Sequence, residues 1–82
     1  MAHSFTIRGQ RISLSREQVI EKLKGKEPGP TTIHVVEIEG TWYPMKEALS
    51  IAIGVDRLKF QTAQALAVFE KLGFKVDRVS NL

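Results

Sequence analysis

Few side chains in this sequence have the types and spacing that catalysis needs. The chain contains two histidines, His3 near its start and His34 in a predicted strand. His34 is either a general base, alone or in a ribonuclease-like site with Tyr43 and a lysine, or a structural residue on a partly solvated strand face. The sequence has no metal-ligand spacing, no paired carboxylates and no phosphate-binding glycine loop. We therefore expect a protein that is not an enzyme and that holds no metal or cofactor.

A group of polar residues between two predicted helices is the best candidate for a binding site. Arg and Gln side chains suit paired hydrogen bonds to guanine and adenine edges, whereas Lys and Thr suit phosphates. A helix N-terminus also attracts phosphate. The group consists of Arg57, Lys59, Gln61, Thr62 and Gln64. Two of these have a structural alternative, because Thr62 suits a helix cap and Gln64 suits a solvated first turn.

The segments on both sides of this group predict a helix-turn-helix. Residues 45–53 form a short apolar helix closed by Gly54, and residues 62–72 form a second helix that ends in the Leu-Gly-Phe pattern of residues 72–74, typical of a Schellman cap. In this motif the second helix enters the DNA major groove. Residues 56–60 form a turn or single helical turn, and the connection as a whole, residues 55–61, is longer than the usual three or four residues. Because most of the second helix is apolar, base reading is restricted to its first turn.

The start of the chain predicts a β-hairpin. Residues 5–8 and 11–14 alternate apolar and polar side chains, and Gly9-Gln10 suits a two-residue type II′ turn. This register pairs Ile7 with Ile12 and places the apolar residues on one face. Two arginines on the polar face are candidates for phosphate contacts: Arg8 and Arg11.

A helix is expected directly after the hairpin. Ser15 and Gln18 have the spacing of a capping box for a helix over residues 16–24, which Gly25 ends. Its first residue, Arg16, is a further candidate for a phosphate contact.

Three more strands complete the predicted fold. Residues 26–30 form a loop with two prolines, residues 31–39 and 41–43 form a second hairpin, and residues 74–79 form a last strand. We expect one α+β domain over residues 1–82, with a small antiparallel sheet of two hairpins and a C-terminal strand, and three helices. A winged helix-turn-helix, with either hairpin as the wing, is the specific arrangement predicted.

Length and composition limit the remaining function classes. Eighty-two residues allow one compact fold, and the lack of cysteine excludes disulfide frameworks and thiol chemistry. No apolar stretch reaches the roughly 20 residues of a membrane span, and the N-terminus lacks the pattern of a secretion signal. We therefore expect a cytoplasmic protein with no membrane partner.

The distribution of charge favours an anionic partner. The formal net charge is +3 at pH 7. Residues 1–26 carry six basic and two acidic side chains, residues 27–43 three acidic ones, and residues 44–82 six basic and four acidic. Two basic regions on either side of an acidic one would steer an anionic molecule to the surface.

The second half of the chain carries Tyr43-Pro44-Met45-Lys46, Ala52, Gly54, Phe60, Thr62, Ala63 and Leu72-Gly73-Phe74. With this pattern, residues 43–74 resemble small bacterial domains that occur alone or attached to HNH-type endonucleases that restrict modified DNA. The resemblance implies DNA binding in a restriction or defence setting, with Lys46 and residues 57–64 at matching positions. It implies no nuclease, because this sequence lacks the His-Asn-His cluster.

These observations predict a non-catalytic DNA-binding module, with DNA preferred over RNA. The alternative is a protein-interaction module, an adaptor or inhibitor of a larger enzyme, which the acidic centre at Glu37 and Glu39 and an exposed strand edge would favour. The predicted phosphate contacts are Arg8, Arg11, Arg16, Lys46, Arg57, Lys59 and Lys71.

Overall fold

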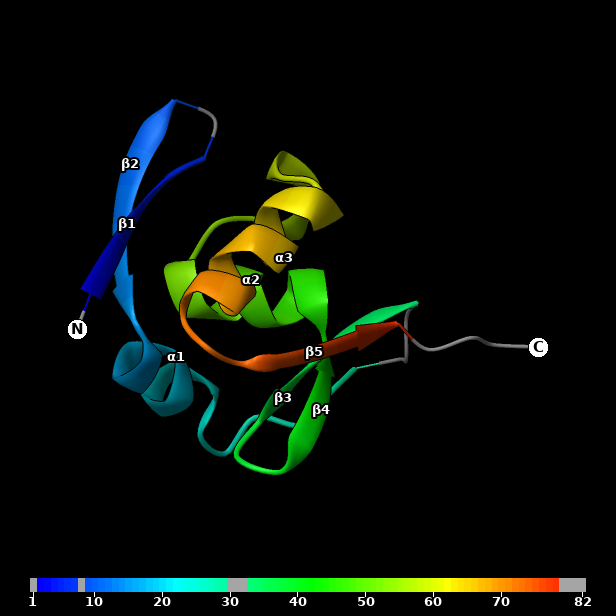
Figure 1. Ribbon diagram of the computed structural model, residues 1–82. Coiled ribbons are helices and arrows are strands. Elements are labelled where there is room, and N and C mark those ends of the chain that lie inside the picture. The colour runs from blue at the N-terminus through cyan, green and yellow to red at the C-terminus, as the bar shows by residue number, and fades with distance from the viewer. Residues whose placement is uncertain (1, 8, 30–32, 79–82) are drawn as a thin grey trace.

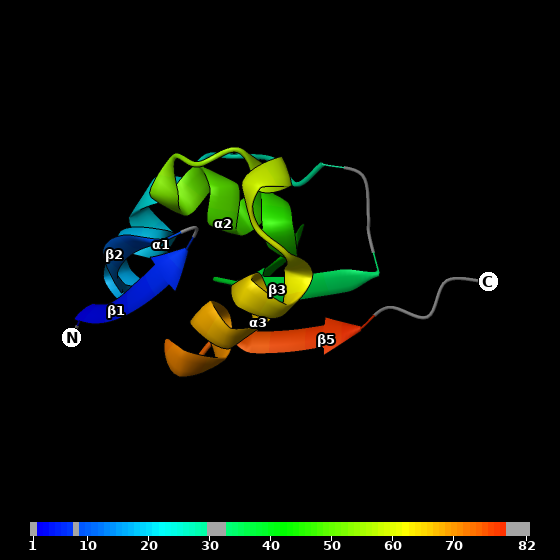
Figure 2. The same cartoon turned by 90° about the horizontal axis from the view of Figure 1, so that it is seen from above.

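The computed structural model describes residues 2–7, 9–29 and 33–78 and has an α+β fold, as predicted (Figure 1). Among the described residues the expected single sheet is two separate antiparallel sheets, one of order β1-β2 and one of order β4-β3-β5. The two sheets lie on different sides of the pair α2 and α3 in both views (Figures 1 and 2). The elements are β1 Ala2–Ile7, β2 Gln10–Ser15, α1 Arg16–Leu23, β3 His34–Ile38, β4 Thr41–Pro44, α2 Met45–Ile53, the 3₁₀ turn η1 Arg57–Lys59, α3 Thr62–Lys71 and β5 Lys75–Arg78.

The hairpin of β1 and β2 is present, but its predicted register is wrong. Phe5 lies opposite Ile12, and Ile7 lies opposite Gln10, so the strands are shifted by two residues from the expected pairing. Gly9, with φ +75°, is the second residue of the loop rather than the first. Because the shift is an even number of residues, the faces are unchanged. Ile7 and Leu14 are buried as expected, and the polar face of β2 is exposed.

Helix α1 begins at the predicted capping box. The Ser15 hydroxyl accepts from the Gln18 backbone N–H at 3.1 Å, and the Gln18 side chain accepts from the Ser15 N–H at 2.8 Å. At the other end of the helix, the Tyr43 hydroxyl donates to the Lys26 carbonyl at 3.0 Å. The Tyr43 ring is buried and its hydrogen bond is partly buried, so Tyr43 ties β4 to the segment after α1.

The second hairpin turns at Glu39 and Gly40, as the sequence predicts. Both residues have positive φ, 51° and 81°, as a type I′ turn requires. Strand β3 is the central strand of its sheet. Its neighbouring residues Val35 and Val36 are both buried, so both faces of the strand are covered at this point, and its apolar residues do not alternate strictly with polar ones. Pro44 lies on the edge strand β4, where its missing N–H leaves no gap in a ladder.

Helices α2 and α3 follow as predicted, with the structured connection η1 between them. Gly54 ends α2 in the left-handed conformation, with φ +71°. Helix α3 ends in the predicted Schellman motif, because the Phe74 N–H donates to the Phe69 carbonyl and the Gly73 N–H to the Glu70 carbonyl, at 3.0 and 3.1 Å. The last strand, predicted from residue 74 to 79, covers Lys75–Arg78, and residue 79 lies outside the described part.

One hydrophobic core joins all of these elements. Phe69 of α3 is fully buried and meets the Phe74 ring edge-on, with the ring centroids 5.8 Å apart. Helix α3 is less enclosed than its sequence predicts, because Ala63 and Ala67 are exposed. None of the helices in the described residues is long and apolar enough to cross a membrane.

Candidate nucleic-acid interface

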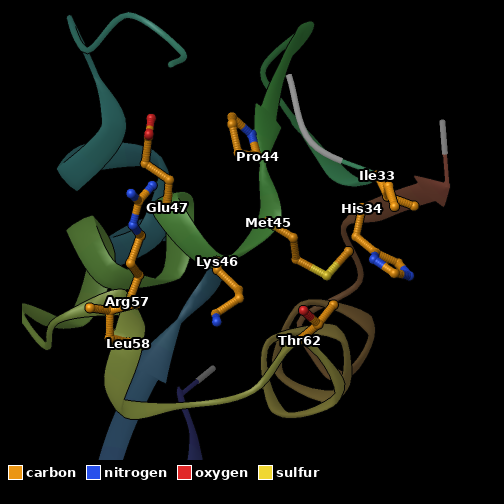
Figure 3. A pocket seen from close by; sticks show the side chains of 9 residues that line it. All are labelled: Ile33, His34, Pro44, Met45, Lys46, Glu47, Arg57, Leu58 and Thr62. Atoms are coloured by element: carbon orange, nitrogen blue, oxygen red, sulfur yellow. The ribbon is translucent and has the colours of Figure 1, made fainter. Parts of the chain in front are cut away.

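A groove of about 650 Å³ lies where α2 begins, between the start of β3 and η1 (Figure 3). The β4–α2 junction forms its floor, since Pro44 and Met45 are both buried. Its lining residues come from β4, α2, η1, α3 and the start of β3: Ile33, His34, Pro44, Met45, Lys46, Glu47, Arg57, Leu58 and Thr62. We call this the α2 groove.

A second hollow of about 430 Å³ lies on the other side of η1, at the start of α3. It is lined by Leu58, Lys59, Phe60, Gln61 and Gln64, and we call it the α3 hollow. Leu58 lines both depressions and therefore forms the ridge between them. Its side chain is 80% exposed, while Phe60, two residues later, is buried in the core.

The charged side chains at the α2 groove present cations to a ligand. Lys46 extends toward the space between Arg57 and Thr62 in Figure 3. Glu47 is the one carboxylate among the lining residues, and it points away from Lys46. Its Oε1 accepts a hydrogen bond from the Gly29 N–H at 3.0 Å. The acid thus fixes the loop after α1, and the groove keeps a net positive lining.

The first turn of α3 differs from its prediction. Thr62 is not the N-cap: it is the first helical residue, half-buried, on the wall of the α2 groove. The cap is Gln61, and the Gln64 Oε1 accepts from the Gln61 backbone N–H at 2.8 Å. Gln64 therefore holds the helix start, and Gln61 is the exposed amide of the two.

The structure brings together six of the predicted binding residues. Lys46, Arg57 and Thr62 line the α2 groove, and Lys59, Gln61 and Gln64 line the α3 hollow beside it. The two depressions share Leu58, so these six side chains border one continuous surface, which we call the η1 surface.

The other predicted phosphate contacts lie elsewhere. Arg16 is engaged at the end of α3, where its Nη1 donates to the Gly73 carbonyl at 2.8 Å and its guanidinium lies 4.3 Å from the Phe74 ring centroid. Lys71 is the last residue of α3, so it is about 13 Å along the helix from Thr62. Arg11 is exposed on the hairpin, and Arg8 lies outside the described residues.

The residues considered for catalysis do not form a common site. His34 lines the α2 groove, whereas Tyr43 lines a different hollow against α1 and donates its hydroxyl proton to the Lys26 carbonyl. Within residues 2–7, 9–29 and 33–78, no group of three or more His, Asp or Glu side chains has a geometry that would hold a metal ion.

Sequence reasoning missed the apolar residues of the site. Ile33 is 52% exposed and Leu58 is 80% exposed, and both line the α2 groove. For Leu58 a signal was present, because it stands between Arg57 and Lys59 in a segment without helical periodicity. An apolar side chain in such a place has no neighbour of its own element to cover it.

Comparisons with known protein families, with curated proteins and with solved structures found no match for this chain.

Proposed function

We propose that this protein is a non-catalytic DNA-binding module whose contact surface is the η1 surface. The observation that carries this proposal is that three cations, Lys46, Arg57 and Lys59, line the two depressions that share Leu58, to which the first turn of α3 also contributes. Cations on one surface neutralise backbone phosphates, which supply most of the affinity of DNA-binding proteins. The dipole of α3 adds to the attraction.

The arrangement of helices supports a winged helix-turn-helix as the mode of binding. Helix α3 presents its first turn, with Gln61 exposed, and the alanines on its solvent side allow its backbone to come close to a groove wall. The β1-β2 hairpin beside α3 serves as the wing, and Arg11 on its polar face contacts phosphate. In this proposal the protein acts in the cytoplasm, in the restriction or defence setting that the resemblance implies.

Salt dependence of duplex binding tests the proposal. Four phosphate contacts, from Lys46, Arg57, Lys59 and Arg11, give a slope of about −3.6 for log affinity against log salt concentration. Arg57→Ala and Lys59→Ala are each expected to reduce this slope by about 1 and to weaken binding about 3- to 10-fold. Fluorescence anisotropy with a labelled duplex at several salt concentrations measures both quantities.

Lys71→Ala is the matched control, since it removes an exposed cation from the far end of the same helix. It is expected to leave the slope unchanged. Duplex RNA is expected to bind more weakly than DNA, because its deep, narrow major groove does not admit a helix. Undetectable binding of DNA at low salt, or equal losses in all three variants, would contradict the proposal.

The exposed apolar residues favour a second candidate, a protein-interaction module. Ile33 and Leu58 present an apolar surface beside cations, as a docking site for an acidic partner would. In that case Leu58→Lys would abolish a stoichiometric complex measured by size-exclusion chromatography with light scattering, and DNA binding would be absent.

A further inference from the structure

The backbone of the turn around Leu58 is held in place, and it keeps the Leu58 side chain exposed. Asp56 holds the turn on both sides of Leu58, because its Oδ1 accepts from the Leu58 N–H and its carbonyl accepts from the Lys59 N–H, both at 2.9 Å. Phe60 then anchors the chain in the core. The Leu58 side chain is thus presented to solvent from a backbone that hydrogen bonds and core packing fix.

Leu58 has a depression with a basic lining on each side. A depression lies on each side of it, and each depression carries cations, Arg57 with Lys46 in the α2 groove and Lys59 in the α3 hollow. A ligand that fills both depressions must straddle the Leu58 ridge. Charge complementarity selects an anionic ligand with apolar surface between its charges, and a nucleic-acid duplex has stacked bases between two phosphate backbones.

We propose that Leu58 is an apolar wedge that enters between two stacked base pairs and kinks the duplex that the η1 surface binds. This inference rests on the proposed DNA-binding function and adds a substrate preference to it. Arg57 and Lys59, which are adjacent to Leu58 in the sequence, hold the phosphates that flank the opened step. Proteins insert leucine in this way from the minor groove, and the resulting kinks are about 20–90°. The wedge is thus an alternative to the major-groove approach of α3 on the same η1 surface.

A wedge gives sequence preference without hydrogen bonds to bases. Pyrimidine–purine steps such as TA and CA are the easiest to unstack, so a site that contains one costs less to kink than an A-tract, which is stiff. We therefore expect the wild-type protein to prefer a duplex with a central TA step over one with an A-tract of equal length.

Fluorescence energy transfer between the ends of a duplex of about 25 base pairs tests the wedge, with anisotropy on the same duplex as the measure of affinity. Wild-type protein is expected to raise the transfer efficiency. Leu58→Ala is expected to remove that rise and to weaken binding about 10-fold. Leu58→Met, which keeps an apolar side chain of similar length, is expected to retain the bend.

Leu58→Lys distinguishes insertion between base pairs from electrostatic attraction to the phosphates. The added cation keeps or raises affinity through phosphate contact, but a hydrated ammonium does not insert between bases, so the bend is lost. If wild-type protein binds without bending, or if Leu58→Ala bends the duplex as the wild type does, the wedge is wrong while the DNA-binding function stands. If the wild type does not bind DNA at all, the proposed function fails, and Leu58 is left to a protein partner.

Discussion

Arg16 joins two segments that lie 57 positions apart in the sequence. Its guanidinium donates to the carbonyl of Gly73 at the end of α3 and lies against the Phe74 ring, where the carbonyl ends of the helix also attract a cation. The sequence predicted a phosphate contact for Arg16 from its charge and its position at a helix start. Neither property reveals a partner so distant in the chain. Its contacts favour a structural role instead.

Substitution of Arg16 distinguishes the two roles. Arg16→Ala is expected to lower the free energy of unfolding by about 1 kcal/mol, since it removes a charged hydrogen bond and a cation–ring contact at a partly exposed site. Urea denaturation measures the loss. The slope of DNA binding against salt is expected to stay at the wild-type value.

Arg16→Lys is the conservative comparison, because it keeps the charge but not the flat guanidinium. We expect it to recover part of the stability. If Arg16→Ala reduced the slope of DNA affinity against salt and left stability unchanged, Arg16 would be a phosphate contact, and the structural role would be wrong.

At the scale of elements, the sequence predicts the helix ends and turns that depend on residues close together in the chain. The Ser15 and Gln18 capping box, the Glu39-Gly40 turn and the Schellman end of α3 all depend on residues within about five positions of one another. The N-cap of α3 was missed although its signal is equally local. Gln61 and Gln64 have the spacing of a capping box, but threonine at the next position is the more usual cap.

The Glu39-Gly40 turn provides a prediction for the second hairpin. Glu39 is exposed and has φ +51°, a conformation that costs an ordinary side chain energy and that asparagine adopts more readily. Glu39→Asn is therefore expected to raise the free energy of unfolding by about 0.5 kcal/mol. The shift of the urea midpoint measures it.

The same substitution two residues earlier is the control. Glu37→Asn places asparagine within strand β3, where it is disfavoured, and is expected to lower the midpoint. A midpoint that falls in Glu39→Asn would show that the Glu39 side chain contributes more than its backbone conformation costs.

At the scale of the whole molecule, the sequence predicts the fold class better than the assembly of the site. Periodicity and turn residues define the elements, but the separation of the strands into two sheets depends on contacts between distant segments. The α2 groove likewise depends on contacts between distant segments. Ile33, Lys46 and Leu58 line one groove because β3 pairs with β4, β4 leads directly into α2, and η1 lies beside the start of α2.

Core packing gives the largest expected effect on stability. Phe69 is fully buried, and Phe69→Ala is expected to cost about 3–5 kcal/mol. A chain of 82 residues has a total stability of about 4–12 kcal/mol. The variant should therefore unfold at a much lower temperature, as circular dichroism would show.

Phe5→Ala serves as the comparison, because Phe5 is only half-buried at the margin of the core. Its loss is expected to be smaller. Equal melting temperatures for Phe69→Ala and the wild type would mean that the core does not depend on this ring.

Because β3 lies between β4 and β5, one of its edges stays unpaired for part of the time that the chain is being translated. Strand β3 pairs with β4 almost as soon as both emerge, but its other partner, β5, is made only after α2, η1 and α3. Until then one edge of an apolar strand is open to pairing with other chains. During translation β3 is therefore exposed to pairing with other chains until β5 has emerged.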